Sequence, residues 1–119
     1  MLPFTKPFKL YLFKDRNTVD WALRVNDTYV QTYTIPQQSF EELIANWQRP
    51  EGHNIAFNNI HFSVQHKKWT PRPEGLPASY IKITAYNNGM QHHFRFDLAD
   101  MLELEKDYYY QKNNGMYWD

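Results

Sequence analysis

Alternating apolar and polar residues predict six β-strands, since successive side chains of a strand point to opposite faces of its sheet. The six segments are residues 8–14, 19–25, 28–35, 60–66, 80–86 and 90–96. Between the last two, Asn88-Gly89 supplies the residues that a two-residue type I′ turn prefers, which would pair Ala85 with His92. In this register the face turned away from the core carries Lys82, Thr84, Tyr86, Gln91, His93 and Arg95.

Inward-facing residues can be assigned for the first two strands but not for the third. The first strand turns Phe8, Leu10 and Leu12 inward and Lys9, Tyr11 and Phe13 outward. The inward-facing residues of the second strand are Val19, Trp21, Leu23 and Val25. If the turn at 26–28 has three residues, the inward side of the third strand is Tyr29, Gln31, Tyr33 and Ile35. A turn one residue longer exchanges this set for the alternate one, and the sequence leaves both registers open.

Two helices are expected, after the third and the sixth strand. The first is predicted at residues 39–48, because apolar residues recur there at helical spacing and Ser39 to Glu42 form a capping box. Its apolar face is Phe40, Leu43, Ile44 and Trp47. The second is predicted at residues 97–107 or slightly beyond, with Asp97 as the N-cap. Its apolar side is predicted to be Leu98, Met101, Leu102 and Glu105.

The order of three strands and a helix occurs twice, in residues 8–48 and 60–107. We therefore expect one α+β domain across residues 1–119, with an antiparallel sheet, two helices and duplicated β-β-β-α halves related by an approximate two-fold axis. Residues 54–57 and the tail at residues 111–119 are the candidates for a further short strand. Residues 67–78 contain three prolines and are expected to form a long loop.

The absence of cysteine excludes disulfides, thiolate metal sites and thiol catalysis, and is typical of a reducing compartment. No apolar stretch approaches the length of a membrane span. Prolines and lysines interrupt the first fourteen residues, where a signal peptide would need a continuous apolar run. These features predict a cytoplasmic protein without membrane contact.

Thirteen basic and thirteen acidic residues cancel, so the chain lacks the overall positive charge of many duplex-DNA binders. Basic residues predominate in the predicted strands, whereas most acidic residues lie in or beside the predicted helices. One interpretation is a positive sheet face and a negative helical face on a neutral molecule. The other is that helix N-termini favour acidic residues in any protein.

Five histidines raise the question of a metal site, but their spacing argues against one. His92 and His93 are neighbours in a strand and point to opposite faces, as do His61 and His66, so neither pair can hold one ion. The sequence also lacks a glycine-rich phosphate loop, a nucleophile elbow and a strand-borne cluster of acids. We therefore expect a protein that is not an enzyme and uses no metal or cofactor.

The outward-facing side of the predicted strands is the strongest candidate for a binding surface. It combines cations that can contact phosphates with aromatic rings on which bases can stack. The candidate strand residues are Lys9, Tyr11, Phe13, Arg24, Tyr80, Lys82, Tyr86, His93 and Arg95. The loop residues Lys67, Lys68, Trp69 and Arg72 are placed to close over this surface from one edge. Aromatic residues are also common in any sheet, and such a face can be covered in a homodimer.

The repeated order of elements resembles the Whirly and PUR families of single-stranded nucleic-acid-binding proteins. Tyr80-Ile81-Lys82-Ile83 is similar to a strand of PUR repeats, and Ile35-Pro36 followed by Phe40 to Ile44 resembles their strand-Pro-helix junction. The chain departs from these families in having three predicted strands in each half where they usually have four. The resemblance implies binding of single-stranded DNA or RNA to the sheet face through Lys82, Tyr86 and Arg95.

A second class of function fits the same residues. Tyrosine and tryptophan are frequent anchors in protein interfaces, so a short chain with many exposed aromatics also suits a protein-binding inhibitor or an immunity protein of a mobile element or toxin system. Its partner would then be a protein. The two classes differ in salt dependence, because phosphate contacts weaken steeply as salt rises.

Overall fold

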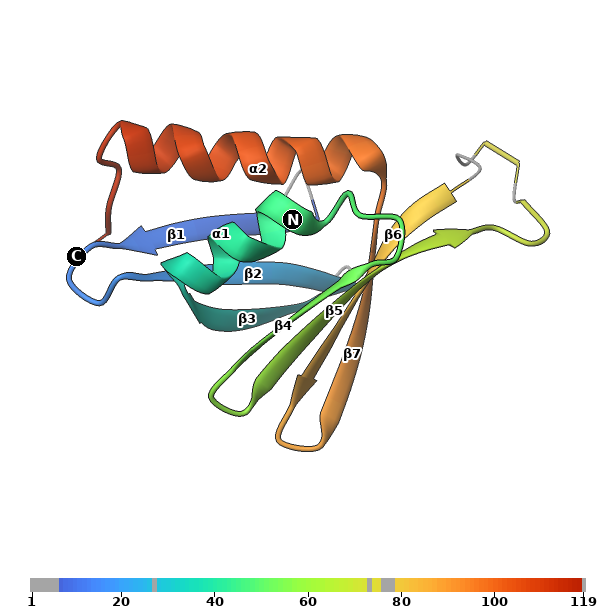
Figure 1. Ribbon diagram of the computed structural model, residues 1–119, viewed down its shortest axis with the longest axis horizontal. Helices are drawn as coiled ribbons and strands as arrows, with labels where there is room; N and C mark the ends of the chain where they lie inside the picture. Colours follow the sequence, from blue (N-terminus) through green and yellow to red (C-terminus); the bar gives the residue numbers. More distant parts are fainter. Residues whose placement is uncertain (1–6, 27, 73, 76–78, 119) are drawn as a thin grey trace.

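The computed structural model describes residues 7–26, 28–72, 74–75 and 79–118 of the chain. Its elements are β1 (Phe8–Phe13), β2 (Thr18–Asn26), β3 (Tyr29–Pro36), α1 (Gln37–Asn46), β4 (His53–Phe57), β5 (Ile60–Lys68), β6 (Ser79–Asn87), β7 (Met90–Phe96) and α2 (Leu98–Asn113). The strands form two antiparallel sheets, β1-β2-β3 and β4-β5-β6-β7, each followed by a helix (Figure 1). The predicted α+β class is confirmed.

Aromatic packing joins the two sheets. Figure 1 shows the strands of the second sheet crossing the direction of the first, with both helices lying along the first sheet. Trp21 of β2 lies at the centre of this junction, with its ring centroid 5.5 Å from that of Phe62 in β5 and 6.4 Å from that of Phe96 in β7. Its edge-to-face partner in α1 is Phe40, at 5.3 Å. One core therefore connects both halves of the chain.

The predicted β6–β7 hairpin is confirmed in turn and register. Asn88 and Gly89 have φ values of 53° and 79°, as a type I′ turn requires, and Ala85 pairs with His92. The inward residues of both strands are buried, with the exception of the half-buried His92. Thr84 is also buried although it faces outward, because it lies in an inner strand between Ser63 and His93.

The structure resolves the open register of the third strand. Tyr33 pairs with Trp21 and Ile35 pairs with Val19, and all four side chains are buried, so the alternative that turns Tyr33 and Ile35 inward is correct for this end of the strand. Tyr29, which the same alternative placed inward, is 46% exposed, so that position is wrong. The ladder is irregular between Arg24 and Asn26. Because an extra residue in one strand breaks the alternation, Val25 is exposed, and its predicted inward position is wrong.

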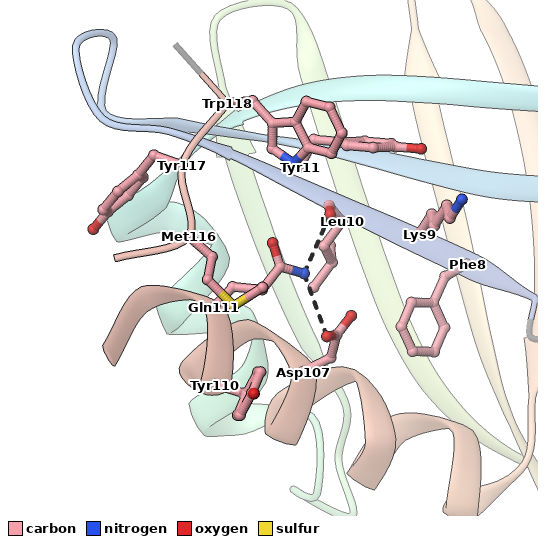
Figure 2. Close-up of a pocket in the computed structure, with 10 residues that line it drawn as sticks. All are labelled: Phe8, Lys9, Leu10, Tyr11, Asp107, Tyr110, Gln111, Met116, Tyr117 and Trp118. Atoms are coloured by element: carbon pink, nitrogen blue, oxygen red, sulfur yellow. Dashed lines mark hydrogen bonds between the residues drawn. The ribbon is translucent and has the colours of Figure 1, made fainter. Parts of the chain in front are cut away.

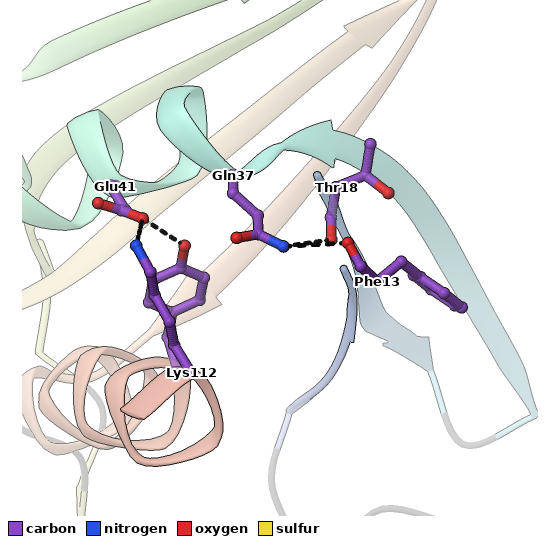
Figure 3. A network of polar contacts seen from close by, with 6 residues as sticks. Phe13, Thr18, Gln37, Glu41 and Lys112 are labelled. Carbon is purple, nitrogen blue, oxygen red and sulfur yellow. Dashed lines mark hydrogen bonds and ion pairs between the residues drawn. The ribbon is translucent and has the colours of Figure 1, made fainter. Parts of the chain in front are cut away.

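Helix α1 begins two residues earlier than predicted, and the capping box at Ser39 is wrong. Pro36 is the N-cap, and the described residues provide no side-chain cap. The Gln37 side chain instead donates hydrogen bonds to the carbonyl oxygens of Phe13 and Thr18, at 3.2 and 3.1 Å (Figure 3). Its backbone N–H donates to Asn17. The β1–β2 hairpin thus fixes where the helix starts, which local sequence could not reveal.

Helix α2 is capped as predicted but is longer and faces the core differently. Asp97 caps it by accepting a hydrogen bond from the backbone N–H of Asp100 at 2.7 Å. The helix continues to Asn113, and its buried residues are Met101, Leu104 and Tyr108. Leu98 and Leu102 are 59% and 48% exposed, so their predicted core positions are wrong. Tyr108, which lies beyond the predicted helix, is buried together with Met101 and Leu104. The core-facing stripe therefore lies on a different side of the helix from Leu98 and Leu102.

The long segment between β5 and β6 also differs from expectation. Lys67 and Lys68, predicted in a loop, belong to β5 and pair with Tyr80 and Ser79. The spare strand candidate at 54–57 is part of β4, so the second sheet has four strands. Both halves contain a meander followed by a helix, and their relation by a two-fold axis stays a prediction. Expectations that depend on residues 1–6, 27, 73 or 76–78, including the N-terminal targeting argument, lie outside the described residues.

A polar contact ties the two helices together (Figure 3). The carboxylate of Glu41 in α1 accepts hydrogen bonds from the Tyr108 hydroxyl, at 2.7 Å, and from the Lys112 ammonium group. Partial burial would raise the pKa of Glu41, but the hydrogen bonds from Lys112 and Tyr108 and the charge of Lys112 outweigh it and lower this pKa. Burial, and then the Glu41 contact, raise the pKa of Tyr108. Neither helix in the described part of the chain is long and apolar enough to cross a membrane.

Substitutions at one buried and one exposed position, Phe40 and Leu102, test this packing. Phe40→Ala should lower the free energy of unfolding by about 3–5 kcal/mol, because it removes a fully buried ring. Leu102→Ala should change it by about 0.5 kcal/mol or less, since this side chain is largely exposed. Chemical denaturation of both variants measures the difference. Equal losses would contradict the orientation of α2.

A second test concerns Glu41. Glu41→Ala should cost about 1–3 kcal/mol, because it leaves the buried Tyr108 hydroxyl without its acceptor. Since the folded state lowers the pKa of Glu41, the stabilisation from its charge is present above the unfolded pKa of about 4.3 and is lost as the pH falls through the folded value. Glu41→Gln, which keeps an acceptor, should therefore differ from the parent at pH 7 and approach it at low pH. Denaturation at several pH values checks this, and a constant difference would contradict it.

Candidate functional site

The thirteen residues predicted to bind lie on two surfaces rather than one. Lys9, Tyr11, Phe13 and Arg24 belong to the first sheet, and the other nine belong to the second sheet or to the loop after β5. Because the ladders join strands only within each of the two described sheets, no single sheet face contains all thirteen. The two surfaces are therefore described separately.

The second sheet brings together a cluster of rings and cations on its outer face. Arg95 and Lys82 are directly cross-strand neighbours on β7 and β6. Trp69, just beyond β5, packs its ring 4.6 Å from that of Tyr80. The guanidinium carbon of Arg95 lies 5.4 Å from the Trp69 ring centroid and 5.6 Å from that of Tyr80. We call Trp69, Tyr80, Lys82 and Arg95 the Arg95 cluster.

One further predicted residue extends the Arg95 cluster along β5. Lys67 is the cross-strand neighbour of Tyr80 and is exposed, and its place in a strand fixes it relative to the cluster. Lys68 is also exposed, but it pairs with Ser79, so its side chain points to the opposite face of the sheet. Arg72 lies further along the loop and is exposed. The predicted closure of this segment over the strands is therefore realised by the Trp69 ring, which reaches Tyr80 and Arg95.

Tyr86 and His93 occupy the other end of this outer face. Tyr86 is 42% exposed and pairs across the ladder with His61. Beside it is an open hollow of about 500 Å³ lined by Asn54, His61, Phe62, Ser63 and Tyr86. The His93 ring is held to the sheet by a 3.1 Å hydrogen bond between its Nδ1 and the Thr84 hydroxyl.

The sequence analysis missed the polar residues of this hollow. Asn54 and Ser63 are cross-strand neighbours on β4 and β5, so their side chains share the outer face. The short strand predicted at 54–57 could have revealed them. If this strand is paired with β5, the alternation of its side chains places one more set of residues on the outer face. The hollow thus adds an amide and a hydroxyl group next to the exposed Tyr86 ring.

The charge of the second sheet differs from that of the helix after it. Between positions 53 and 96 the chain has five lysines and arginines and all five of its histidines, but Glu74 as its only acidic residue. From position 97 to the end, the chain has six acidic residues and two lysines. The chain is neutral as a whole, but its second sheet is basic and the helix after it is acidic. Both charge imbalances are larger than the preference of one helix N-terminus for acidic residues explains.

The candidate residues of the first sheet have different surroundings (Figure 2). The Tyr11 ring contacts that of Trp118 edge to face at 5.0 Å, and the guanidinium of Arg16 lies 4.1 Å from the Phe13 ring centroid. The Trp118 backbone N–H donates to Leu12, so the C-terminal tail follows the edge of β1. Tyr11 is therefore partly covered by the chain itself.

A groove opens between β1, the end of α2 and this tail. It has a volume of about 630 Å³ and is lined mainly by aromatic and apolar side chains, among them Phe8, Tyr110 and Trp118. The Gln111 amide crosses it, donating to the Leu10 carbonyl oxygen and to Asp107, both at 3.3 Å (Figure 2). Sequence reasoning missed Trp118 and Arg16, although the aromatic tail was visible as a spare strand candidate.

Among the described residues, no group of three or more histidines or acidic side chains is arranged to hold a metal ion. Burial, with a smaller effect of Tyr29, raises the pKa of Tyr33 to about 12, but this ring lies in the core rather than on either surface. Compared with models of protein families, with curated proteins and with solved structures, the chain has no match.

Proposed function

We propose that the chain binds single-stranded DNA or RNA on the outer face of its second sheet, without catalysis and without a cofactor. The observation that carries the proposal is the Arg95 cluster, in which two cations and two rings are neighbours on one face. Single-strand binders combine these two kinds of group, since cations contact the phosphates and rings stack with the bases.

The geometry of Arg95 suits a phosphate contact. Its guanidinium carbon lies 5.4 and 5.6 Å from the centroids of the Trp69 and Tyr80 rings, within the range of a cation–π contact with each. Because guanidinium N–H groups point outward in the plane, packing on a ring leaves them free to reach a phosphate. Lys82 beside it adds a second positive charge. The rings thus orient Arg95 at little cost to its hydrogen-bonding capacity.

The hollow beside Tyr86 suits a base. The exposed ring offers a stacking surface, and Asn54 and Ser63 offer groups that can hydrogen-bond to a base edge. Single strands expose these edges, whereas a duplex hides them in its paired interior. Four residues separate Lys82 from Tyr86 along β6, or about 13 Å. We infer that the sugar-phosphate backbone of the nucleic acid contacts the Arg95 cluster while one of its bases enters the hollow.

A protein partner is the second candidate function. Trp118 is 64% exposed beside the groove at β1, and a large exposed ring next to an apolar groove is typical of protein interfaces. This surface belongs to the first sheet and the tail, so it is separate from the Arg95 cluster. Binding there should depend weakly on salt, which distinguishes it from phosphate-driven binding.

Fluorescence polarisation with a mixed-sequence single-stranded oligonucleotide tests the proposal. The parent should bind more weakly as salt rises, and Arg95→Ala should lower the slope of log K against log salt by about 0.7, the value for one lost phosphate contact. Arg95→Lys should keep the slope near that of the parent because it keeps the charge. Arg49→Ala is the matched control, since Arg49 is exposed outside the sheets and pairs with Glu51.

The stacking part of the proposal is tested by a second pair of variants. Tyr86→Ala should weaken binding by about 1–3 kcal/mol without changing the salt slope. Tyr110→Ala, which removes a tyrosine of α2 that is even more exposed, 60% against 42%, should leave binding unchanged. Failure of the parent to bind at low salt would exclude this function and leave the protein partner. Parent-like binding by both Arg95→Ala and Tyr86→Ala would place the activity on another surface.

A further inference from the structure

Helix α2 has a second apolar stripe, most of which lies outside the core. Leu98 and Leu102 are 59% and 48% exposed, and Tyr109, seven residues after Leu102, is half-buried, with part of its side chain packed against the core. Residues spaced by four and seven lie on one side of a helix, so these three form a continuous stripe. The core-facing stripe of the same helix is Met101, Leu104 and Tyr108. The second stripe is therefore available to a partner.

This stripe contains both a projection and a depression. A shallow depression of about 470 Å³ runs along the stripe from Leu102 to Asn114, and its lining also includes Tyr109 and Asn113. The N-terminal part of the stripe has Leu98 as a largely exposed side chain. A helix that ran antiparallel to α2 could place a leucine of its N-terminal half in this depression, as in the packing of knobs into holes.

We propose that α2 pairs antiparallel with α2 of a second copy of this chain. The sequence of the stripe is self-complementary about the midpoint between Glu105 and Lys106. A two-fold axis at that point places Leu102 opposite Tyr109 of the second copy and Leu98 opposite Asn113. It also places Glu105 opposite Lys106, twice in each dimer. A two-fold dimer needs such self-complementarity, because the same patch forms both sides of the interface.

Charge selects the antiparallel orientation. Glu105 and Lys106 are neighbours at the midpoint of the helix, so an antiparallel pair places Glu105 of one copy opposite Lys106 of the other, whereas a parallel pair would place Glu105 opposite Glu105 and Lys106 opposite Lys106. Lys112 does not contribute to this choice, because it is paired with Glu41 of its own chain. The helix dipoles favour the same arrangement.

The size of the helix predicts a weak dimer. Sixteen residues span about 24 Å, and two such helices alone bury less surface than a standard stable interface. Association should therefore depend on concentration in a measurable range. The pairing does not depend on the proposed nucleic-acid function, because the stripe lies on α2 and the Arg95 cluster on the second sheet and the loop after β5.

Sedimentation velocity without nucleic acid, over about a thousandfold range of protein concentration, tests the pairing. The parent should change from monomer to dimer, and Leu102→Glu should raise the dissociation constant at least tenfold. Met90→Glu is the matched control, since Met90 is 62% exposed at the end of the β6–β7 turn and should leave dimerisation unchanged. Thermal melting should show that both variants remain folded.

Charge reversal tests the register. Lys106→Glu and Glu105→Lys should each raise the dissociation constant about threefold to tenfold, because each places like charges opposite each other. The double variant Glu105→Lys/Lys106→Glu should restore the parent value. A parent that stays monomeric at every concentration overturns the proposal. So does a dimer that Leu102→Glu leaves intact or a double variant that fails to recover.

Discussion

The packing of aromatic rings around Trp21 is the interaction on which the rest of the structure depends. In the described part of the chain the two sheets are separate in their hydrogen bonding, so side chains have to hold them together. Trp21 contacts rings of α1, β5 and β7, and Tyr33 packs against Phe62 at 5.1 Å. Trp21 Nε1 has no hydrogen-bond partner among the described residues, which costs about 1–3 kcal/mol. The area that such a ring buries offsets this cost.

This junction also decides where a binding site can lie. Both helices insert buried residues into the core on the inner side of the sheets, and Glu41 with Tyr108 and Lys112 ties one helix to the other. The inner faces are thus fully used by packing. Both helices of the described residues lie along the first sheet, and the alternation of the strands in the second sheet turns Lys82, Tyr86 and Arg95 outward (Figure 1). The fold therefore leaves a rigid outer face on which rings and cations have fixed neighbours.

The sequence predicted those features that depend on local patterns. Alternation and the Asn88-Gly89 turn gave the register of β6 and β7, because both signals act within a few residues. The start of α1 was missed because Gln37 binds the β1–β2 hairpin, which is a tertiary contact. The core face of α2 was missed because the helix has apolar residues on two sides, and spacing does not tell which side is covered. Outward orientation of the site residues followed from alternation, but their division between two sheets depends on strand pairing that a local pattern does not contain.

A net charge of zero does not argue against nucleic-acid binding in a molecule of this size. At physiological ionic strength the field of an exposed charge falls off over about 8 Å. The molecule measures 26 Å even along its shortest axis, so charges on opposite surfaces are screened from one another. A nucleic acid bound at the second sheet, as proposed, would therefore encounter the five lysines and arginines of positions 53–96 more strongly than the acidic residues far along α2. The acidic residues of α2 would repel a nucleic acid that approached from the side of this helix. The separation of basic and acidic residues thus favours one face for a nucleic acid and leaves the other to a protein surface of mixed charge.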